Sequence, residues 1–403
     1  MTRRWVSRRV LPATLVAALL LAGGCSPDEY VAPPPVQGSE VADPAAAAAT
    51  VATLQESLDD PEAAAALGSG DGAELLRALA ENASALRLSD VTLRYVTETG
   101  RTSGADAWDA LVAITWRLEG LDAASSRVEV PVSFAEGGAR IAAIGATGSR
   151  LPLWLAGPLT VRRTPGAVVL AGAPATEVDK YARWAARAVR AVRSQLGAED
   201  GLVVEIPGDT EALHRALDAD AGTYDAIAAV TAPVDGSQAA GSPVHVFVNP
   251  AVYDDLDPVA GQVVMTHEAV HAVTGATLAR RAPLWLLEGF ADHVALRDVD
   301  LPASRTAAQI IKQVQRDGLP ETLPADSALD PASHHLGAAY EGAWQVTEAL
   351  VERGGEDALV AFYEAVLDGT TVDSALRRRF DWSVAQLTRA WRSRLAMLAG
   401  VPE

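Results

Sequence analysis

The segment that most constrains this chain is an HExxH pentapeptide, His267-Glu268-Ala269-Val270-His271. Asp257 is a good helix N-cap before it, Pro258 suits the first helical position, and Gly275 is a good helix terminator after it. The pentapeptide is therefore predicted to lie on a capped helix, where positions four apart share one face. Both imidazoles then reach one metal ion, whereas Glu268 is rotated away and reaches water beside it. The alternative is two histidines on a helix face without a ligand role.

A second predicted helix, starting at Pro283, supplies a candidate third ligand. Glu288 lies there in an apolar stretch, Trp285-Leu286-Leu287-Glu288-Gly289-Phe290, and burying its charge is unfavourable unless a cation compensates. Asp292 follows one turn later on the same face, where we expect it to accept the free N–H of His267. Either acid can instead be an exposed helix residue. Cysteine ligands are excluded because the chain has one cysteine.

These segments together resemble the gluzincin metallopeptidases, in particular the peptidase MA-like group related to aminopeptidase N and thermolysin. The resemblance covers roughly residues 176–400. It implies one Zn²⁺ per chain bound by His267, His271 and Glu288, with a zinc-activated water and Glu268 as general base. It also implies that Asp292 orients a ligand histidine. The spacing between the second histidine and Glu288 is shorter by a few residues than in those two relatives.

A third segment resembles the YEKGA sequence of the aminopeptidase N-like enzymes, without its lysine. This segment is Ala339-Tyr340-Glu341-Gly342-Ala343. The resemblance implies that the Tyr340 hydroxyl stabilises the oxyanion, while the alternative is a core tyrosine on a helical stripe. His334 and His335 are candidate proton donors of the thermolysin kind, or surface histidines.

One segment of the aminopeptidase N-like enzymes is absent, the GxMEN sequence that binds the amino terminus of the substrate. The residues before HExxH read Val246-Phe247-Val248-Asn249-Pro250 instead. Strict aminopeptidase activity is therefore not expected. A predicted strand at 244–248 is the candidate edge strand for pairing with an extended peptide substrate.

The first residues resemble a bacterial lipoprotein signal. Four arginines among residues 1–9 precede an apolar run from Val10 to Ala22, too short to span a bilayer, and then Gly23-Gly24-Cys25. The resemblance implies cleavage before Cys25 and acylation of that residue, for example by palmitate. The protein would then be anchored by lipid at the extracytoplasmic face of the cell membrane. The alternative is a plain secretory signal peptide.

A chain of 403 residues is expected to form more than one domain. The predicted organisation is a signal peptide at 1–24, a Pro-rich linker at 25–44, an accessory domain at 45–172 and a metallopeptidase domain at 176–403. The accessory domain has helices followed by an antiparallel sheet, including strands at 159–163 and 167–170, and loosely resembles NTF2-like domains. The second domain combines strands at 202–206, 226–230 and 244–248 with a mostly helical remainder. The predicted fold class is α+β in both.

The net charge of the chain limits the classes of partner that it is expected to bind. The formal net charge of −19 argues against binding to nucleic-acid phosphates, which needs clustered Lys and Arg. The expected partners are a peptide or protein substrate and the membrane that holds the lipid. Two other functions stay open: a non-catalytic zinc-containing lipoprotein that binds a cell-surface partner, and a solute-binding lipoprotein acting through residues 45–172.

Overall fold

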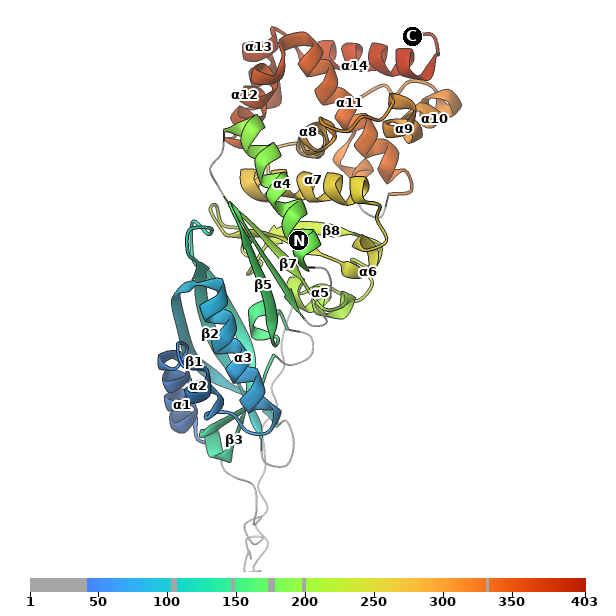
Figure 1. The fold of residues 1–403 in the computed structure, drawn as a ribbon. Coiled ribbons are helices and arrows are strands. Elements are labelled where there is room, and N and C mark those ends of the chain that lie inside the picture. The colour runs from blue at the N-terminus through green and yellow to red at the C-terminus, as the bar shows by residue number, and fades with distance from the viewer. Residues whose placement is uncertain (1–41, 103–106, 146–148, 173–177, 198–200, 331–332) are drawn as a thin grey trace, which may run out of the picture. The chain divides into compact units, whose positions relative to one another are not determined.

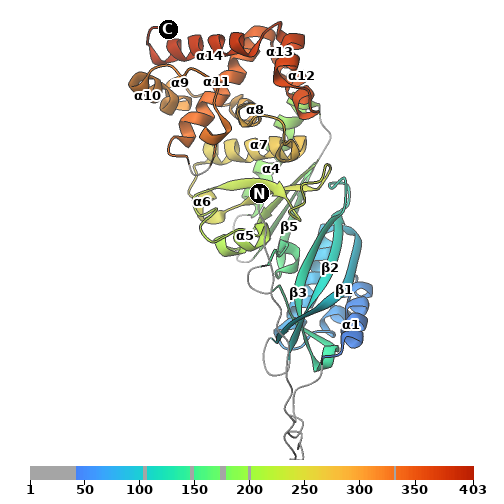
Figure 2. The ribbon, with the colours of Figure 1, turned by 180° about the vertical axis from the view of Figure 1, so that it is seen from behind.

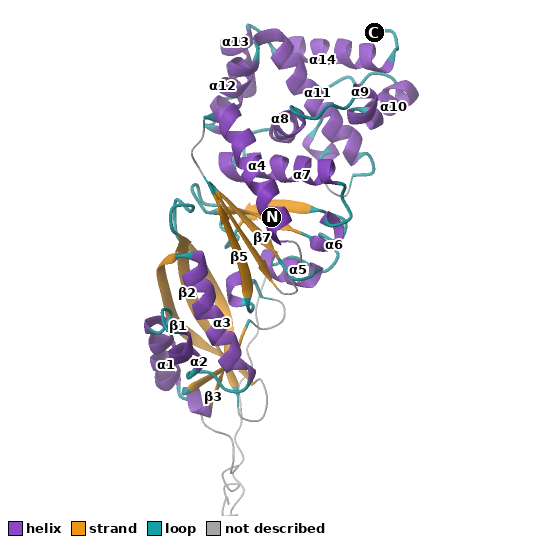
Figure 3. Ribbon diagram, in the orientation of Figure 1, coloured by secondary structure: helices purple, strands orange, loops and turns teal. Residues whose placement is uncertain are grey.

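The computed structural model describes residues 42–102, 107–145, 149–172, 178–197, 201–330 and 333–403 (Figure 1). The predicted signal peptide, Cys25 and nearly all of the predicted linker lie outside these residues. The described chain is α+β: an antiparallel sheet, then a mixed sheet, then a helical C-terminal half (Figure 3). None of the helices within the described ranges has the length and apolar character needed to cross a membrane.

The N-terminal part has helices followed by a four-stranded antiparallel sheet in the order β1-β2-β3-β4. Val128, Val130, Val132 and Phe134 occupy alternate positions along β3 and are buried, whereas Arg127 before them and Glu129 between the first two are exposed. This period of two gives the sheet one apolar face. The elements are α1 (Pro44–Glu56), α2 (Pro61–Ala65), α3 (Asp71–Leu86), β1 (Leu88–Thr102), β2 (Trp108–Leu118), β3 (Ser126–Ala135) and β4 (Arg140–Ile144).

The second sheet has five strands in the order β5-β6-β7-β9-β8. They are β5 (Leu159–Thr164), β6 (Ala167–Gly172), β7 (Leu202–Ile206), β8 (Ala229–Pro233) and β9 (Val244–Val248). The prediction that the first two strands belong to the antiparallel sheet of the accessory domain is therefore wrong, because β6 pairs in parallel with β7 of this second sheet. The physical reason lies in β6, whose residues from Ala167 to Ala171 are all buried, as expected of a strand covered on both faces.

The edge of this sheet also differs from the prediction. The strand at 244–248 is not an edge strand, because β9 pairs in parallel with β7 and antiparallel with β8. Four consecutive β9 residues from His245 to Val248 are buried, which is typical of an interior strand. The edge strand beside β9 is β8, which lies three residues later than predicted and ends at Pro233, a residue that edge strands tolerate.

Two long helices lie together over this sheet, α4 (Val178–Leu196) and α7 (Pro258–Thr274) (Figure 1). They approach closely at Gly261 of α7, where a Cβ would lie 2.9 Å from the Trp184 ring of α4. The sheet and both helices share a core with the C-terminal helices. Those helices gather at one end of the described chain (Figure 2): α8 (Leu284–Leu296), α9 (Ala303–Thr306), α10 (Ala308–Asp317), α11 (Leu336–Gly354), α12 (Glu356–Leu367), α13 (Val372–Phe380) and α14 (Val384–Ala399). Two short helices lie before α7, α5 (Thr210–Leu217) and α6 (Pro250–Tyr253).

Helix α7 begins and ends where the sequence predicts. The Asp257 side chain accepts hydrogen bonds from the backbone N–H groups of Val259 and Ala260, and Pro258 is the first helical residue. Gly275 terminates the helix with φ of 63°, a left-handed conformation that suits glycine. These caps fix the register of the HExxH pentapeptide.

A buried ionic cluster links β7, β9 and the segment after β2. His245 lies 2.7 Å from Glu205 through Nδ1 and 3.1 Å from Asp122 through Nε2, and its side chain is 2% exposed. Burial alone would lower the pKa of His245, but the Asp122 and Glu205 carboxylates raise it to about 10. The imidazolium is therefore the resident form at neutral pH.

We expect His245→Gln to lower the free energy of unfolding by about 3–5 kcal/mol at pH 7, because two buried carboxylates lose their cation. Since the folded-state pKa is raised, the contribution of His245 is fully present below pH 6.5 and is lost as the pH rises through about 10. Urea unfolding of the wild type and of His245→Gln at pH 7 and pH 10.5 measures the difference between their free energies of unfolding. This difference should be smaller at pH 10.5, and a difference independent of pH would contradict the ionic role of His245.

Candidate metal centre

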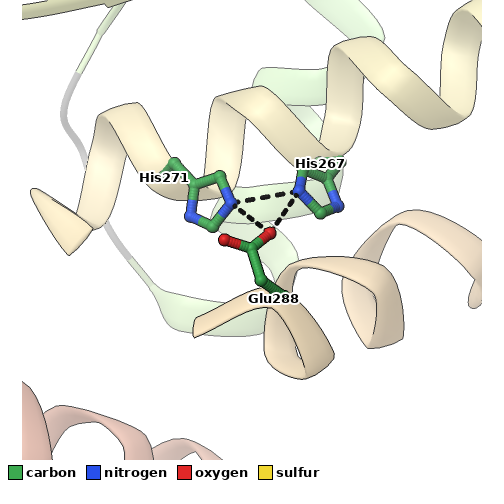
Figure 4. A group of neighbouring side chains, drawn as sticks. All are labelled: His267, His271 and Glu288. Atoms are coloured by element: carbon green, nitrogen blue, oxygen red, sulfur yellow. Dashed lines mark hydrogen bonds and ion pairs between the residues drawn. The ribbon is translucent and has the colours of Figure 1, made fainter. Parts of the chain in front are cut away.

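Three side chains from two helices converge on one point (Figure 4). His267 Nε2 lies 3.0 Å from His271 Nε2, and Glu288 Oε2 lies 3.0 Å and 3.2 Å from those two nitrogen atoms. The histidines are one turn apart on α7, and Glu288 comes from α8. Helix α8 in turn packs on α11 at Gly289, where a Cβ would overlap the backbone of Ala343. This close approach sets the position of Glu288.

The three atoms fit a divalent metal ion. Zinc–ligand distances of about 2.0–2.1 Å at tetrahedral angles place ligand atoms roughly 3.3 Å apart, close to the spacing seen here. Two imidazoles and a carboxylate are also the ligand types of known catalytic zinc sites. Burial would raise the pKa of Glu288, but the two histidines lower it, so the carboxylate is ionised. The site therefore offers a cation one carboxylate oxygen and two imidazole nitrogen atoms.

Asp292 holds the first histidine. Its Oδ1 lies 2.8 Å from His267 Nδ1, the ring nitrogen that points away from the other two ligands. Burial opposes a charge on His267, but Asp292 and Glu288 raise its pKa well above the usual value. The metal-free site thus retains a proton that a metal ion must displace. By contrast, His271 Nδ1 is buried without a hydrogen-bond partner among the described residues.

We expect Asp292→Asn to weaken zinc affinity by about 10- to 100-fold, because the carboxylate fixes the ring of His267 and increases its basicity. Competition with a fluorescent zinc chelator at pH 7 measures the change. Asp298→Asn is the matched control, since Asp298 is exposed just beyond α8. Equal affinities of the two variants would contradict the role of Asp292.

Glu268 lies on α7 between the two histidines but is not part of the ligand group. Its carboxylate Oε2 accepts a hydrogen bond from the Thr231 hydroxyl at 2.6 Å. Burial raises the pKa of Glu268, although the neighbouring histidines and Thr231 oppose the shift. A buried carboxylate with a raised pKa beside a metal site is suited to general base chemistry.

Tyr340 lies near the site on α11. Its ring centroid is 6.0 Å from that of His267, in a tilted arrangement. Burial and the carboxylates of Glu288 and Glu268 raise the pKa of Tyr340, so its hydroxyl keeps its proton and can donate a hydrogen bond. The next residue, Glu341, has a different task, because its carboxylate accepts the backbone N–H groups of Gln309 and Ile310 at the start of α10.

The two candidate proton donors are not brought to the site by any contact among the described residues. His334 and His335 are both exposed just before α11. Another histidine, His293, follows Asp292 directly on α8. It is buried and lies 2.8 Å from both Glu348 and Glu356, so it joins α8 to α11 and α12.

Thr231 is the residue of the site that the sequence did not indicate. It lies on edge strand β8, one position beyond the predicted strand 226–230, and belongs to no motif. A threonine in a β-rich segment has no signal that distinguishes it from other strand residues. Only the position of β8 relative to α7 reveals its contact with Glu268.

Comparisons with known proteins show that this chain is only weakly similar to solved structures. No family model and no curated protein matches the sequence. Among solved structures, the M1 zinc metallopeptidase from Deinococcus radiodurans is similar at 16% identity with a TM-score of 0.39, over 76% of this chain and 61% of that one. A mutant of that enzyme bound to a Tyr-Ser-Ala substrate gives the same values. The chain thus matches less than two thirds of the length of these proteins, and at this similarity no functional conclusion follows.

Proposed function

We propose that the protein is a zinc-dependent peptidase. The observation that carries the proposal is the convergence of His267, His271 and Glu288 within hydrogen-bond distance of one another, with the Glu268 carboxylate held alongside. A metal site with a purely structural role has no need for a buried, separately held carboxylate next to its ligands. The general base therefore favours a hydrolase over a non-catalytic zinc protein.

The chain's own residues supply the proton transfers. Zinc, when bound, supplies a Lewis acid that polarises a peptide carbonyl and lowers the pKa of water toward neutrality. Glu268 accepts the proton of the attacking water and passes it to the leaving amine. Tyr340 donates a hydrogen bond to the oxygen on which negative charge develops. Asp292 keeps His267 in the tautomer that presents Nε2 to the ligand group.

The proposal extends to the location of the protein. Its support is the sequence alone: the apolar run ending in Gly23-Gly24-Cys25, with the only cysteine of the chain at the acylation position. A lipid on Cys25 would tether the peptidase to the outer face of the cell membrane. Membrane fractionation of the full chain and of Cys25→Ala tests this part separately, and an equal membrane fraction for both proteins would contradict it.

The function is tested by digestion of a mixed-sequence peptide library with the zinc-loaded protein, analysed by mass spectrometry. New termini within the peptides are expected, because the GxMEN sequence that binds a substrate amino terminus in the aminopeptidase N-like enzymes is absent before the HExxH pentapeptide. The Glu268→Gln protein is the control for contaminating proteases. Identical cleavage by both proteins, or no cleavage by either, would contradict the proposal.

A further inference from the structure

Edge strand β8 contacts helix α7 through one side chain at the general base. The Thr231 Oγ1 atom lies 2.6 Å from Glu268 Oε2 and 3.1 Å from the Glu268 backbone oxygen. Both residues are buried, with Thr231 7% and Glu268 9% exposed. A hydroxyl has one proton, and the carboxylate oxygen at the shorter distance is its principal acceptor.

Among the described residues, the hydrogen bond from Thr231 is the one that holds the carboxylate of Glu268 in place. The two neighbouring histidines act on it through charge, and their ring nitrogens contact Glu288 and Asp292 instead. Without Thr231, rotation about the side-chain bonds of Glu268 would be limited by packing alone. Because Thr231 engages Oε2, the second oxygen, Oε1, remains available to accept a proton.

We propose that Thr231 is a positioning residue for the general base, an inference that rests on the proposed peptidase function. Its hydroxyl holds Glu268 in the orientation that directs the free oxygen toward the attacking water. Thr231 itself touches neither the ligand group nor the reacting atoms, so it acts through Glu268. A displacement of about 1 Å in a reacting group can reduce a rate by about 10²-fold, which sets the scale of the expected effect.

The placement of Thr231 gives this hydrogen bond a rigid support. Thr231 pairs with Val246 of the interior strand β9, whereas the outer side of β8 pairs with no strand of the described chain. The strand alternates, and the buried positions Ala229, Thr231 and Pro233 share one face. The backbone of β8 therefore fixes the hydroxyl relative to α7.

Three substitutions separate positioning from folding. Thr231→Val removes the hydroxyl while it keeps the branched shape and a high strand propensity, and Thr231→Ser restores the hydroxyl. Thr160→Val makes the same chemical change on β5, at the opposite edge of the sheet. For each protein we would measure kcat and KM on a cleaved library peptide, zinc affinity, the thermal midpoint, and the Glu268 conformation in crystals.

We expect kcat of Thr231→Val to fall by about 10- to 100-fold with KM and zinc affinity unchanged, while Thr231→Ser and Thr160→Val stay within about twofold of the wild type. Crystals of Thr231→Val should show the Glu268 carboxylate displaced or in more than one rotamer. A kcat of Thr231→Val within twofold of the wild type would overturn the proposal, as would an unmoved Glu268. If the wild-type protein cleaves nothing, the peptidase function fails, while the crystals still decide whether Thr231 holds Glu268.

Discussion

Purified Glu268→Gln protein is expected to bind zinc with wild-type affinity and to hydrolyse peptides about 10²- to 10⁴-fold more slowly. Glutamine has nearly the same shape as glutamate, and its carbonyl oxygen can still accept the Thr231 hydroxyl. It cannot accept a proton from water at neutral pH, so the change removes the base and leaves the ligand group intact. The expected loss is therefore in kcat rather than in zinc binding.

Glu364→Gln is the matched control, because Glu364 is exposed on α12 and away from the ligand group. Zinc content by atomic absorption and initial rates on one cleaved peptide should be measured for both variants. The control is expected to keep the wild-type rate. Full activity in Glu268→Gln would show that another group accepts the proton, and a loss of zinc together with activity would show that Glu268 supports the metal instead.

Replacing His271 with alanine is expected to weaken zinc binding more than Asp292→Asn does. The aspartate change disturbs the orientation of a ligand, at a cost of about 10- to 100-fold in affinity, whereas the histidine change removes a ligand bond. Hydrolysis should be lost because two donors remain, His267 and Glu288, too few for a catalytic zinc site with three protein ligands.

The same chelator competition measures zinc affinity in this variant, with His334→Ala as control because His334 is exposed before α11. The thermal midpoint of the metal-free proteins must also be compared. His271 Nδ1 makes no hydrogen bond among the described residues, and Glu288 keeps its contact with His267 when His271 Nε2 is removed, so the metal-free variant should remain folded. Wild-type zinc affinity in His271→Ala would remove this histidine from the metal site.

Local signals predicted the elements that carry the chemistry. Asp257, Pro258 and Gly275 located α7, and Pro283 located the start of α8, because caps and prolines act on the residues next to them. The apolar stretch around Glu288 also indicated a buried acid. These signals depend on short-range geometry alone, which a single sequence contains.

The order of the strands in the second sheet could not be predicted from the sequence in the same way. The strands at 159–164 and 167–172 have a hairpin turn between them, so the sequence indicates that they pair with each other. Nothing local indicates that β6 continues in parallel with β7, or that β8 lies outside β9. For the same reason Thr231 was missed, because its contact with Glu268 joins residues that are far apart in the chain.

The most direct measurement is a crystal structure of the zinc-loaded protein, with anomalous data collected on both sides of the zinc absorption edge. One anomalous peak per chain is predicted, about 2.0–2.2 Å from His267 Nε2, His271 Nε2 and a carboxylate oxygen of Glu288. The Glu268 carboxylate should lie beside the ion without ligating it, with Oε2 on Thr231. A zinc ion bound elsewhere, or a Glu288 side chain turned away from the two histidines, would contradict the account.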